Sequence, residues 1–166
     1  DDECALPTEV GRETIERLQR CDSLLEKISN GEITKINDFI TYNLDIRLFV
    51  EDVIRNTQDH LLVLHFYEAL QNVTILDPTC GSGAFLFAAM NILEPLYEAC
   101  IDRMEDFNKQ KGNLFKAQLE EIDAKYSSNR QYFIFKSIIL RNLYGVDIMV
   151  EATEIAKLRL FLKMVA

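Results

Sequence analysis

The sequence predicts an α/β fold in which parallel strands alternate with helical crossovers, preceded by a helical N-terminal segment. Residues 73–76 form a short apolar strand pattern, followed by a turn with Gly81 and Gly83 and by a long apolar helix. A second short strand pattern at 143–148 leads into another helix. Residues 1–71, by contrast, carry only helical periodicity. Strands that alternate with helices along the chain are typical of a parallel sheet.

The N-terminal segment, residues 1–71, is expected to contain three helices. Apolar residues recur at helical spacing over residues 10–28, which indicates the first of them. Asp38 and Asp59 each stand just ahead of an apolar periodic run, so each is expected to cap a helix. The helix that begins at Asp38 is expected to continue to Ile54.

Residues 72–166 are expected to form part of a nucleotide-type core. The stretch at 106–130 is rich in charge, and we expect it to be an exposed helical insertion that lengthens the crossover between the two strands. Ser128 is expected to cap the helix that follows it. The expected elements are a strand at 73–76, helices at 84–104 and 128–139, a strand at 143–148 and a helix at 150–164.

The composition excludes several classes of protein. The net charge of −9 and the lack of a Lys/Arg cluster are not typical of a surface that binds nucleic acid. Any DNA or RNA is therefore expected to be bound mainly by other parts of a parent protein. No run of about 18 apolar residues is evident, so no membrane span is expected. The chain begins with Asp and breaks off inside a helical pattern, so we expect a piece of a longer protein.

The four cysteines, at positions 4, 21, 80 and 100, show neither metal-ligand spacing nor the density of a disulfide framework. Free thiols in a reducing cytoplasm are therefore expected. His60 and His65 are five positions apart, which does not place them on one helix face as metal ligands. No metal site is predicted.

The glycine turn is the strongest candidate for a ligand site, because ligands of open α/β sheets bind at the carboxyl ends of the strands. A P-loop would need a lysine beside the glycines, and none is present. A dinucleotide fingerprint would need a third glycine where Leu86 stands. Asp77, four residues ahead of Gly81, would also repel a pyrophosphate.

S-adenosylmethionine fits this turn better. Its sulfonium and ammonium groups are attracted to Asp77, and its carboxylate can meet the N-terminus of the helix that starts at Ala84. Asp147, at the end of the second strand, can accept both ribose hydroxyls, and Ile148 can pack on the adenine. A structural interpretation stays open beside this one: both aspartates could cap the helices that follow them, with the glycines serving the geometry of the turn.

The sequence also resembles a known family. Residues 76–86, Leu-Asp-Pro-Thr-Cys-Gly-Ser-Gly-Ala-Phe-Leu, resemble motif I of adenine-specific (N6) DNA methyltransferases of restriction–modification systems. The likeness is to the large single-chain enzymes and to the modification subunits of multisubunit systems. Residues 144–160, which begin Tyr-Gly-Val-Asp-Ile, are similar to the strand and helix that follow in that family. The resemblance thus implies a Rossmann-like core that binds S-adenosylmethionine, in a cytoplasmic protein that acts on DNA.

The resemblance also implies roles for individual residues. Asp147 would hold the ribose and Ile148 would flank the adenine. The methionyl side of the cofactor would be lined by Asp77, Pro78, Thr79, Cys80, Gly81, Ser82, Gly83, Ala84 and Phe85.

Two departures from the family pattern matter. Asp147 lies 64 residues after Gly83, which the insertion at 106–130 explains. The family's catalytic Asn/Asp-Pro-Pro-Tyr/Phe motif is absent, so no catalytic residue is assigned and the fragment alone is expected to be inactive. Other subunits of a restriction–modification system are possible partners. The alternatives are the cofactor-binding part of an RNA or protein methyltransferase, and a non-enzymatic helical interaction module.

Overall fold

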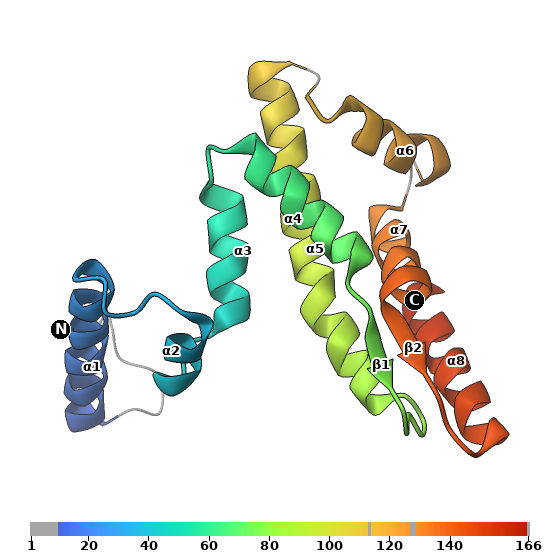
Figure 1. Ribbon diagram of the computed structural model, residues 1–166, viewed down its shortest axis with the longest axis horizontal. Coiled ribbons are helices and arrows are strands. Elements are labelled where there is room, and N and C mark those ends of the chain that lie inside the picture. Colours follow the sequence, from blue (N-terminus) through green and yellow to red (C-terminus); the bar gives the residue numbers. More distant parts are fainter. Residues whose placement is uncertain (1–9, 113, 127–128, 166) are drawn as a thin grey trace. The chain divides into compact units, whose positions relative to one another are not determined.

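The computed structural model describes residues 10–112, 114–126 and 129–165 (Figure 1). The chain divides into two compact units, Asp1–Ile46 and Arg47–Ala166. The predictions made for Cys4 and Ser128 fall outside the described residues. The domain boundary expected between 71 and 72 stays a prediction, although the compact second unit begins earlier, at Arg47.

The first unit contains α1 (Gly11–Ser29) and α2 (Ile36–Thr41). The helix predicted over residues 10–28 is confirmed as α1. Asp38 does not precede α2 as its cap but lies in its first turn. From there its carboxylate accepts hydrogen bonds from the backbone N–H groups of Thr34 (3.0 Å) and Lys35 (2.9 Å). These two bonds lower the pKa of Asp38.

The continuous helix predicted from Asp38 to Ile54 is wrong. It is divided into α2 and α3 (Ile46–Asn56) by a turn at residues 42–45. Asn43 in this turn has a φ of 52°, the left-handed conformation that ends helices and that asparagine tolerates better than most residues. The apolar periodicity continues across the break, which is why the sequence pattern does not reveal it.

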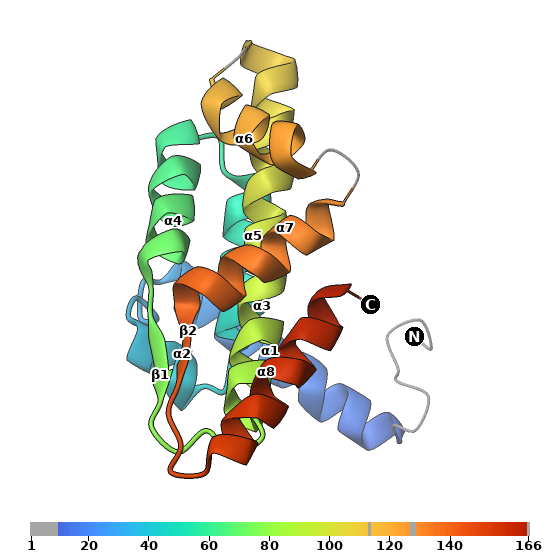
Figure 2. The same ribbon diagram turned by 90° about the vertical axis from the view of Figure 1, so that its right-hand side faces the viewer.

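The second unit is built around two long neighbouring helices and a small sheet (Figures 1 and 2). Its helices α4 and α5 lie side by side, and α5 also packs on both strands. Asp59 caps α4 as predicted, because its carboxylate accepts a hydrogen bond from Leu61 N at 2.9 Å. After α3, the elements are α4 (His60–Asn72), β1 (Ile75–Asp77), α5 (Ala84–Lys111), α6 (Lys116–Tyr126), α7 (Arg130–Ser137), the π-helical turn η2 (Ile138–Asn142), β2 (Leu143–Gly145) and α8 (Val150–Val165).

The two strands pair in parallel, as the sequence predicts, with Ile75 opposite Leu143 and Asp77 opposite Gly145. Both strands differ from their predicted bounds. Strand β1 starts two residues later than predicted, and β2 ends at Gly145 instead of residue 148. The pairing continues by one hydrogen bond, from Val146 N to Asp77 O at 2.9 Å. The described part of the chain is therefore mostly helical, with a two-stranded parallel sheet.

The charged stretch at 106–130 contains the end of α5 and all of α6, with non-helical residues at 112 and 114–115 between them, but the expectation that it is exposed is wrong for three of its apolar residues. Phe107, Phe115 and Ile122 are all buried and belong to the hydrophobic core. Asn129 caps α7, because its side chain accepts a hydrogen bond from Tyr132 N at 2.9 Å. Whether the stretch is an insertion into a shorter crossover stays a prediction.

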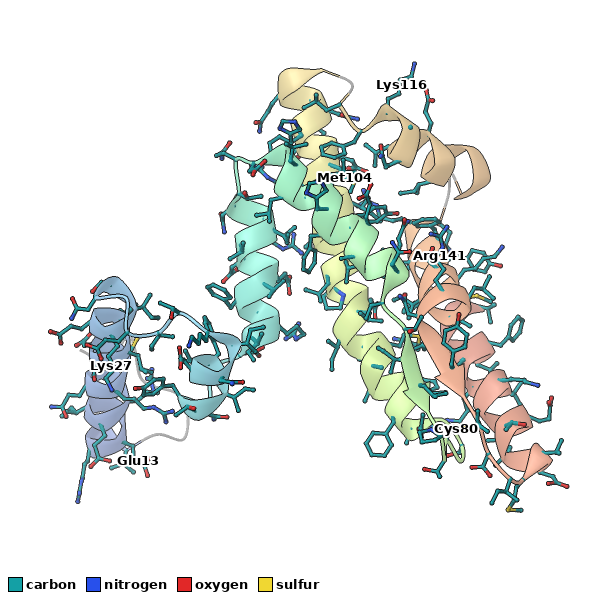
Figure 3. The ribbon with its side chains drawn as sticks, in the orientation of Figure 1. Glu13, Lys27, Cys80, Met104, Lys116 and Arg141 are labelled. Carbon is teal, nitrogen blue, oxygen red and sulfur yellow. The ribbon has the colours of Figure 1, made fainter. Side chains whose placement is uncertain are left out.

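Helix α5 is the central element of the core, and several of its residues, including Tyr97, Cys100 and Met104, are completely buried. Met104 is labelled in Figure 3. By length and composition it could cross a membrane, which the sequence reading did not anticipate. However, 44% of the most apolar 18-residue window of α5 is buried inside the protein. Helices in the cores of other proteins share this length and composition, and α5 supplies many residues of the hydrophobic core. Burial also raises the pKa of Cys100 to about 12.

A buried polar network joins the amino ends of the two strands. The Asn142 side chain, which is completely buried, donates hydrogen bonds to Leu70 O at 2.6 Å and to Val73 O at 2.7 Å. The Tyr97 hydroxyl lies 3.1 Å from both Asn142 Oδ1 and Leu70 O. Burial raises the pKa of Tyr97, so its hydroxyl keeps its proton. The network ties the entry to β1 to the residue just before β2.

Candidate functional site

The turn between β1 and α5 depends on its two glycines. Gly81 has a φ of 50° and Gly83 a φ of 85°, both in the left-handed region that favours glycine. A Cβ on Gly83 would lie 3.1 Å from the Cβ of Ala156 in α8, whereas a Cβ on Gly81 would meet open space. Gly83 thus serves close packing of the turn on α8, while Gly81 leaves one side of the turn open.

Asp77 stands at the end of β1 with an exposed fraction of 9%. Its Oδ1 accepts a hydrogen bond from Thr79 N at 3.1 Å. Its Oδ2 is buried and has no hydrogen-bond partner among the described residues. Buried polar atoms are rarely left in this state, and the known reasons include local strain, a catalytic role and a bound water or ion. Asp77 therefore presents an acceptor that nothing in the described protein uses.

Asp147 lies on the other side of the same turn, just beyond β2. Its Oδ2 accepts a hydrogen bond from Gly81 N at 2.8 Å, and its Oδ1 accepts one from Met149 N at 2.9 Å. Bonds from the backbone of Met149 and Gly81 lower the pKa of Asp147. The carboxylate thus holds the glycine turn and caps the chain entering α8. Each carboxylate oxygen has more than one lone pair, so both can accept further donors.

The backbone of the turn is otherwise closed by short bonds. Cys80 N donates to Val146 O at 2.9 Å, and Gly83 N donates to Cys80 O at 2.7 Å. No side chain of the described residues caps the start of α5 at Gly83. The first N–H groups of α5 thus have no side-chain cap among the described residues, a setting that favours an anionic group.

Two apolar side chains lie exposed beside the turn. Phe85, in the first turn of α5, is 77% exposed, and Ile148 is fully exposed. Exposed large apolar residues are common singly, but these two flank a turn that carries an unsatisfied carboxylate. Pro78, Thr79, Ser82 and Ala84 are also exposed, so most of the predicted site residues are accessible.

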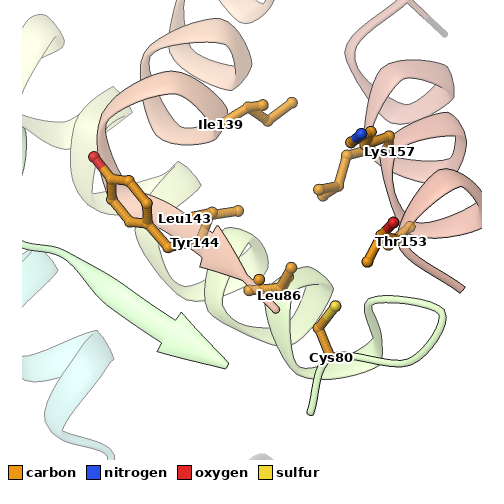
Figure 4. A pocket seen from close by; sticks show the side chains of 10 residues that line it. Cys80, Leu86, Ile139, Leu143, Tyr144, Thr153 and Lys157 are labelled. Carbon is orange, nitrogen blue, oxygen red and sulfur yellow. The ribbon is translucent and has the colours of Figure 1, made fainter. Parts of the chain in front are cut away.

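Cys80 is buried and packs against β2 (Figure 3). A Cβ on Gly145 would lie 3.0 Å from its Sγ, so the strand needs glycine there. Cys80 also lines an apolar cavity of about 280 Å³ behind the turn, with Leu86, Ile139, Leu143 and others (Figure 4). Neither Asp77 nor Asp147 lines this cavity, so it is separate from the surface where the two aspartates meet the turn.

One residue that contacts the turn is missing from the sequence prediction. Arg159 of α8 donates from Nη1 to Ser82 O at 2.9 Å and to Ser82 Oγ at 3.0 Å. The only sequence signal was its place in the Lys-Leu-Arg run at 157–159, which carries no information about the turn. No group of three or more His, Cys, Asp or Glu side chains gathers as a metal site within the described ranges.

Residues 51–165 match the family described as the MmeI DNA-methyltransferase domain. The chain belongs to this family. The resemblance to DNA methyltransferases is thereby confirmed at the level of the family, and such a domain requires a methyl donor. The match begins in α3 and ends in α8, so it spans nearly all of the second unit.

A curated relative from Methanocaldococcus jannaschii is 34% identical to the chain over 131 residues. Its name describes it provisionally as a type II restriction enzyme and methyltransferase. The aligned part covers 79% of this chain but 9% of the relative, so the chain spans less than a tenth of the relative's length. No solved structure matches the chain significantly.

Proposed function

We propose that the chain is the S-adenosylmethionine-binding part of a DNA adenine-N6 methyltransferase within a larger restriction–modification protein. In this proposal, residues 72–166 form part of a Rossmann-like core, and the parent protein is cytoplasmic. The catalytic Asn/Asp-Pro-Pro-Tyr/Phe motif and the surfaces that grip DNA lie elsewhere in the parent. The type II restriction enzyme and methyltransferase from Methanocaldococcus jannaschii supports the system type.

The observation that carries the proposal is the unsatisfied oxygen of Asp77. Asp77 Oδ2 is buried at the end of β1 and lacks a hydrogen-bond partner among the described residues. A buried carboxylate oxygen is stabilised by a donor, and most of all by a charged one. S-adenosylmethionine carries an ammonium, a sulfonium and two ribose hydroxyls. A ligand with net positive charge at this end satisfies Asp77, whereas a phosphate would be repelled.

The other predicted residues accommodate the rest of the same ligand. Residues 78–85 line the methionyl side, where the uncapped start of α5 meets the carboxylate. Asp147 accepts the ribose hydroxyls with the lone pairs that Gly81 N and Met149 N leave unused. Ile148, fully exposed beside it, packs on the adenine face.

The choice of adenine N6 as the methylated atom rests on the likeness of residues 76–86 to motif I of the adenine-specific enzymes. The domain's contribution to the reaction is positional. It holds the sulfonium so that the methyl group points toward the amine, which the rest of the protein supplies as an extruded base.

The test is methyl transfer by the natural protein that contains this chain. The protein is incubated with double-stranded DNA and S-adenosylmethionine that carries a labelled methyl group, and the digested DNA is analysed for labelled nucleosides. We expect label in N6-methyladenine, with loss of label in an Asp77→Asn variant that remains folded. Label on RNA or protein and not on DNA would support the alternative substrate classes. Absence of any label, together with no cofactor binding, would contradict the proposal.

A further inference from the structure

The glycine turn is contacted from α8 by a charged side chain. Arg159 Nη1 donates to both the carbonyl oxygen of Ser82 (2.9 Å) and its hydroxyl oxygen (3.0 Å). Ser82 lies between the two glycines of left-handed conformation. The direction of its carbonyl therefore depends on the backbone conformation of the turn. The guanidinium carbon lies 4.9 Å from the centre of the Phe87 ring, in the first turns of α5. The ring thereby restrains the arginine that holds Ser82.

Two further contacts come to the turn from the same part of the chain. Asp147 Oδ2 accepts the N–H of Gly81 at 2.8 Å. Gly83 approaches Ala156 so closely that an added Cβ would lie 3.1 Å away. Ala156 and Arg159 are three residues apart on α8 and therefore share one helix face. Each of the three residues of the turn thus meets a different residue of the segment after β2.

We propose that Arg159 is a positioning residue that holds the glycine turn, through Ser82, in the conformation that receives the ligand. Without the arginine, the middle of the turn loses its only charged donor among the described residues, and its glycines give it freedom to rotate. The part of this inference that concerns cofactor affinity rests on the proposed function, whereas the part that concerns the turn does not.

The test compares three variants of the natural protein that contains the chain. Arg159→Ala removes the donor, and Arg159→Lys keeps a charged donor without the planar fork. Lys163→Ala is the matched control. Lys163 also lies on α8 with its Nζ 5.0 Å from the centre of an aromatic ring, that of Phe135, but no contact joins it to the turn in the described structure.

The first readout is hydrogen exchange of the unliganded protein, followed in a peptide that covers residues 78–87. We expect exchange in this peptide to become about fivefold faster in Arg159→Ala, while exchange in α4 stays unchanged. Lys163→Ala should leave the peptide as it is. Equal exchange in all variants, or faster exchange spread over the whole domain in Arg159→Ala, would overturn the proposal.

The second readout is the dissociation constant of S-adenosylmethionine, measured by calorimetry. We expect Arg159→Ala to bind about tenfold more weakly, Lys163→Ala to bind normally, and Arg159→Lys to recover to within about threefold. Unchanged affinity in Arg159→Ala would overturn the role in ligand binding. A folded wild-type protein that does not bind S-adenosylmethionine would contradict the proposed function, and the exchange experiment would still decide whether Arg159 holds the turn.

Discussion

At the amino ends of β1 and β2, Asn142 and Tyr97 form a buried network in which the amide and the hydroxyl all have partners. At the carboxyl ends of the same strands, Asp77 has a buried oxygen for which the described residues offer no hydrogen-bond partner. Both ends are polar and both are close to the core. Satisfied polar groups thus hold the strands in register, whereas the unsatisfied oxygen is the place where the proposed function puts a ligand.

The largest effect is expected at the satisfied end. Asn142→Ala removes the donors to Leu70 O and Val73 O and leaves buried groups without partners. We expect the free energy of unfolding to fall by about 3 kcal/mol, measured by denaturant unfolding. Asn72→Ala is the control, because Asn72 is exposed and its amide donates to Glu68 O within the same helix. A loss at Asn142 no greater than at Asn72 would mean that the network does not stabilise the strands.

A smaller effect is expected in the glycine turn. Gly83→Ala places a side chain on a residue with a φ of 85° and brings its Cβ to 3.1 Å from Ala156. We expect a loss of about 2 kcal/mol in the free energy of unfolding. Gly81→Ala meets open space and carries only the conformational cost, about 1 kcal/mol. If Gly81→Ala proved as harmful as Gly83→Ala, close packing on α8 would not be what distinguishes the two glycines.

The smallest effect is a pH dependence at Asp147. Its pKa in the folded protein lies below the ordinary value of 3.8, because backbone N–H groups bind the charged form. The stabilisation is therefore present above about pH 4 and is lost as the pH falls through the folded-state pKa. We expect the difference in unfolding midpoint between the wild type and Asp147→Asn to be constant from pH 5 to 8 and to shrink below about pH 4. A constant difference at all pH values would show that the carboxylate charge is not involved.

Much of the fold could be predicted because the signals are local. Asp59 caps α4 from its own neighbourhood in sequence, and the glycine turn and the parallel strands follow from short patterns. The break at Asn43 could not be predicted, because the apolar periodicity runs through it. Phe107 and Phe115 lie in a charged stretch, and their burial depends on how α5, α6 and α7 pack together.

In the candidate site, too, some features could be predicted from the sequence and others could not. The positions of Asp77 and Asp147 could be predicted, because Asp77 ends β1, Asp147 lies two residues beyond β2, and the carboxyl ends of parallel strands meet at one edge. The bond from Gly81 N to Asp147 joins residues 66 positions apart, and the bonds of Arg159 to Ser82 span 77 positions. Contacts at such separations depend on how α8 returns to the turn, so no local motif signals them.

In the proposed function, the buried oxygen of Asp77 that has no partner among the described residues receives the positive end of the methyl donor. The direct measurement is calorimetric titration of S-adenosylmethionine into the wild type and Asp77→Asn, with unfolding of both followed in parallel. We predict that Asp77→Asn binds at least about tenfold more weakly, while its free energy of unfolding is unchanged or higher by up to about 1 kcal/mol, because a neutral amide is easier to bury. Equal affinity in the two proteins would contradict the claim, and so would a variant that loses affinity only because it unfolds.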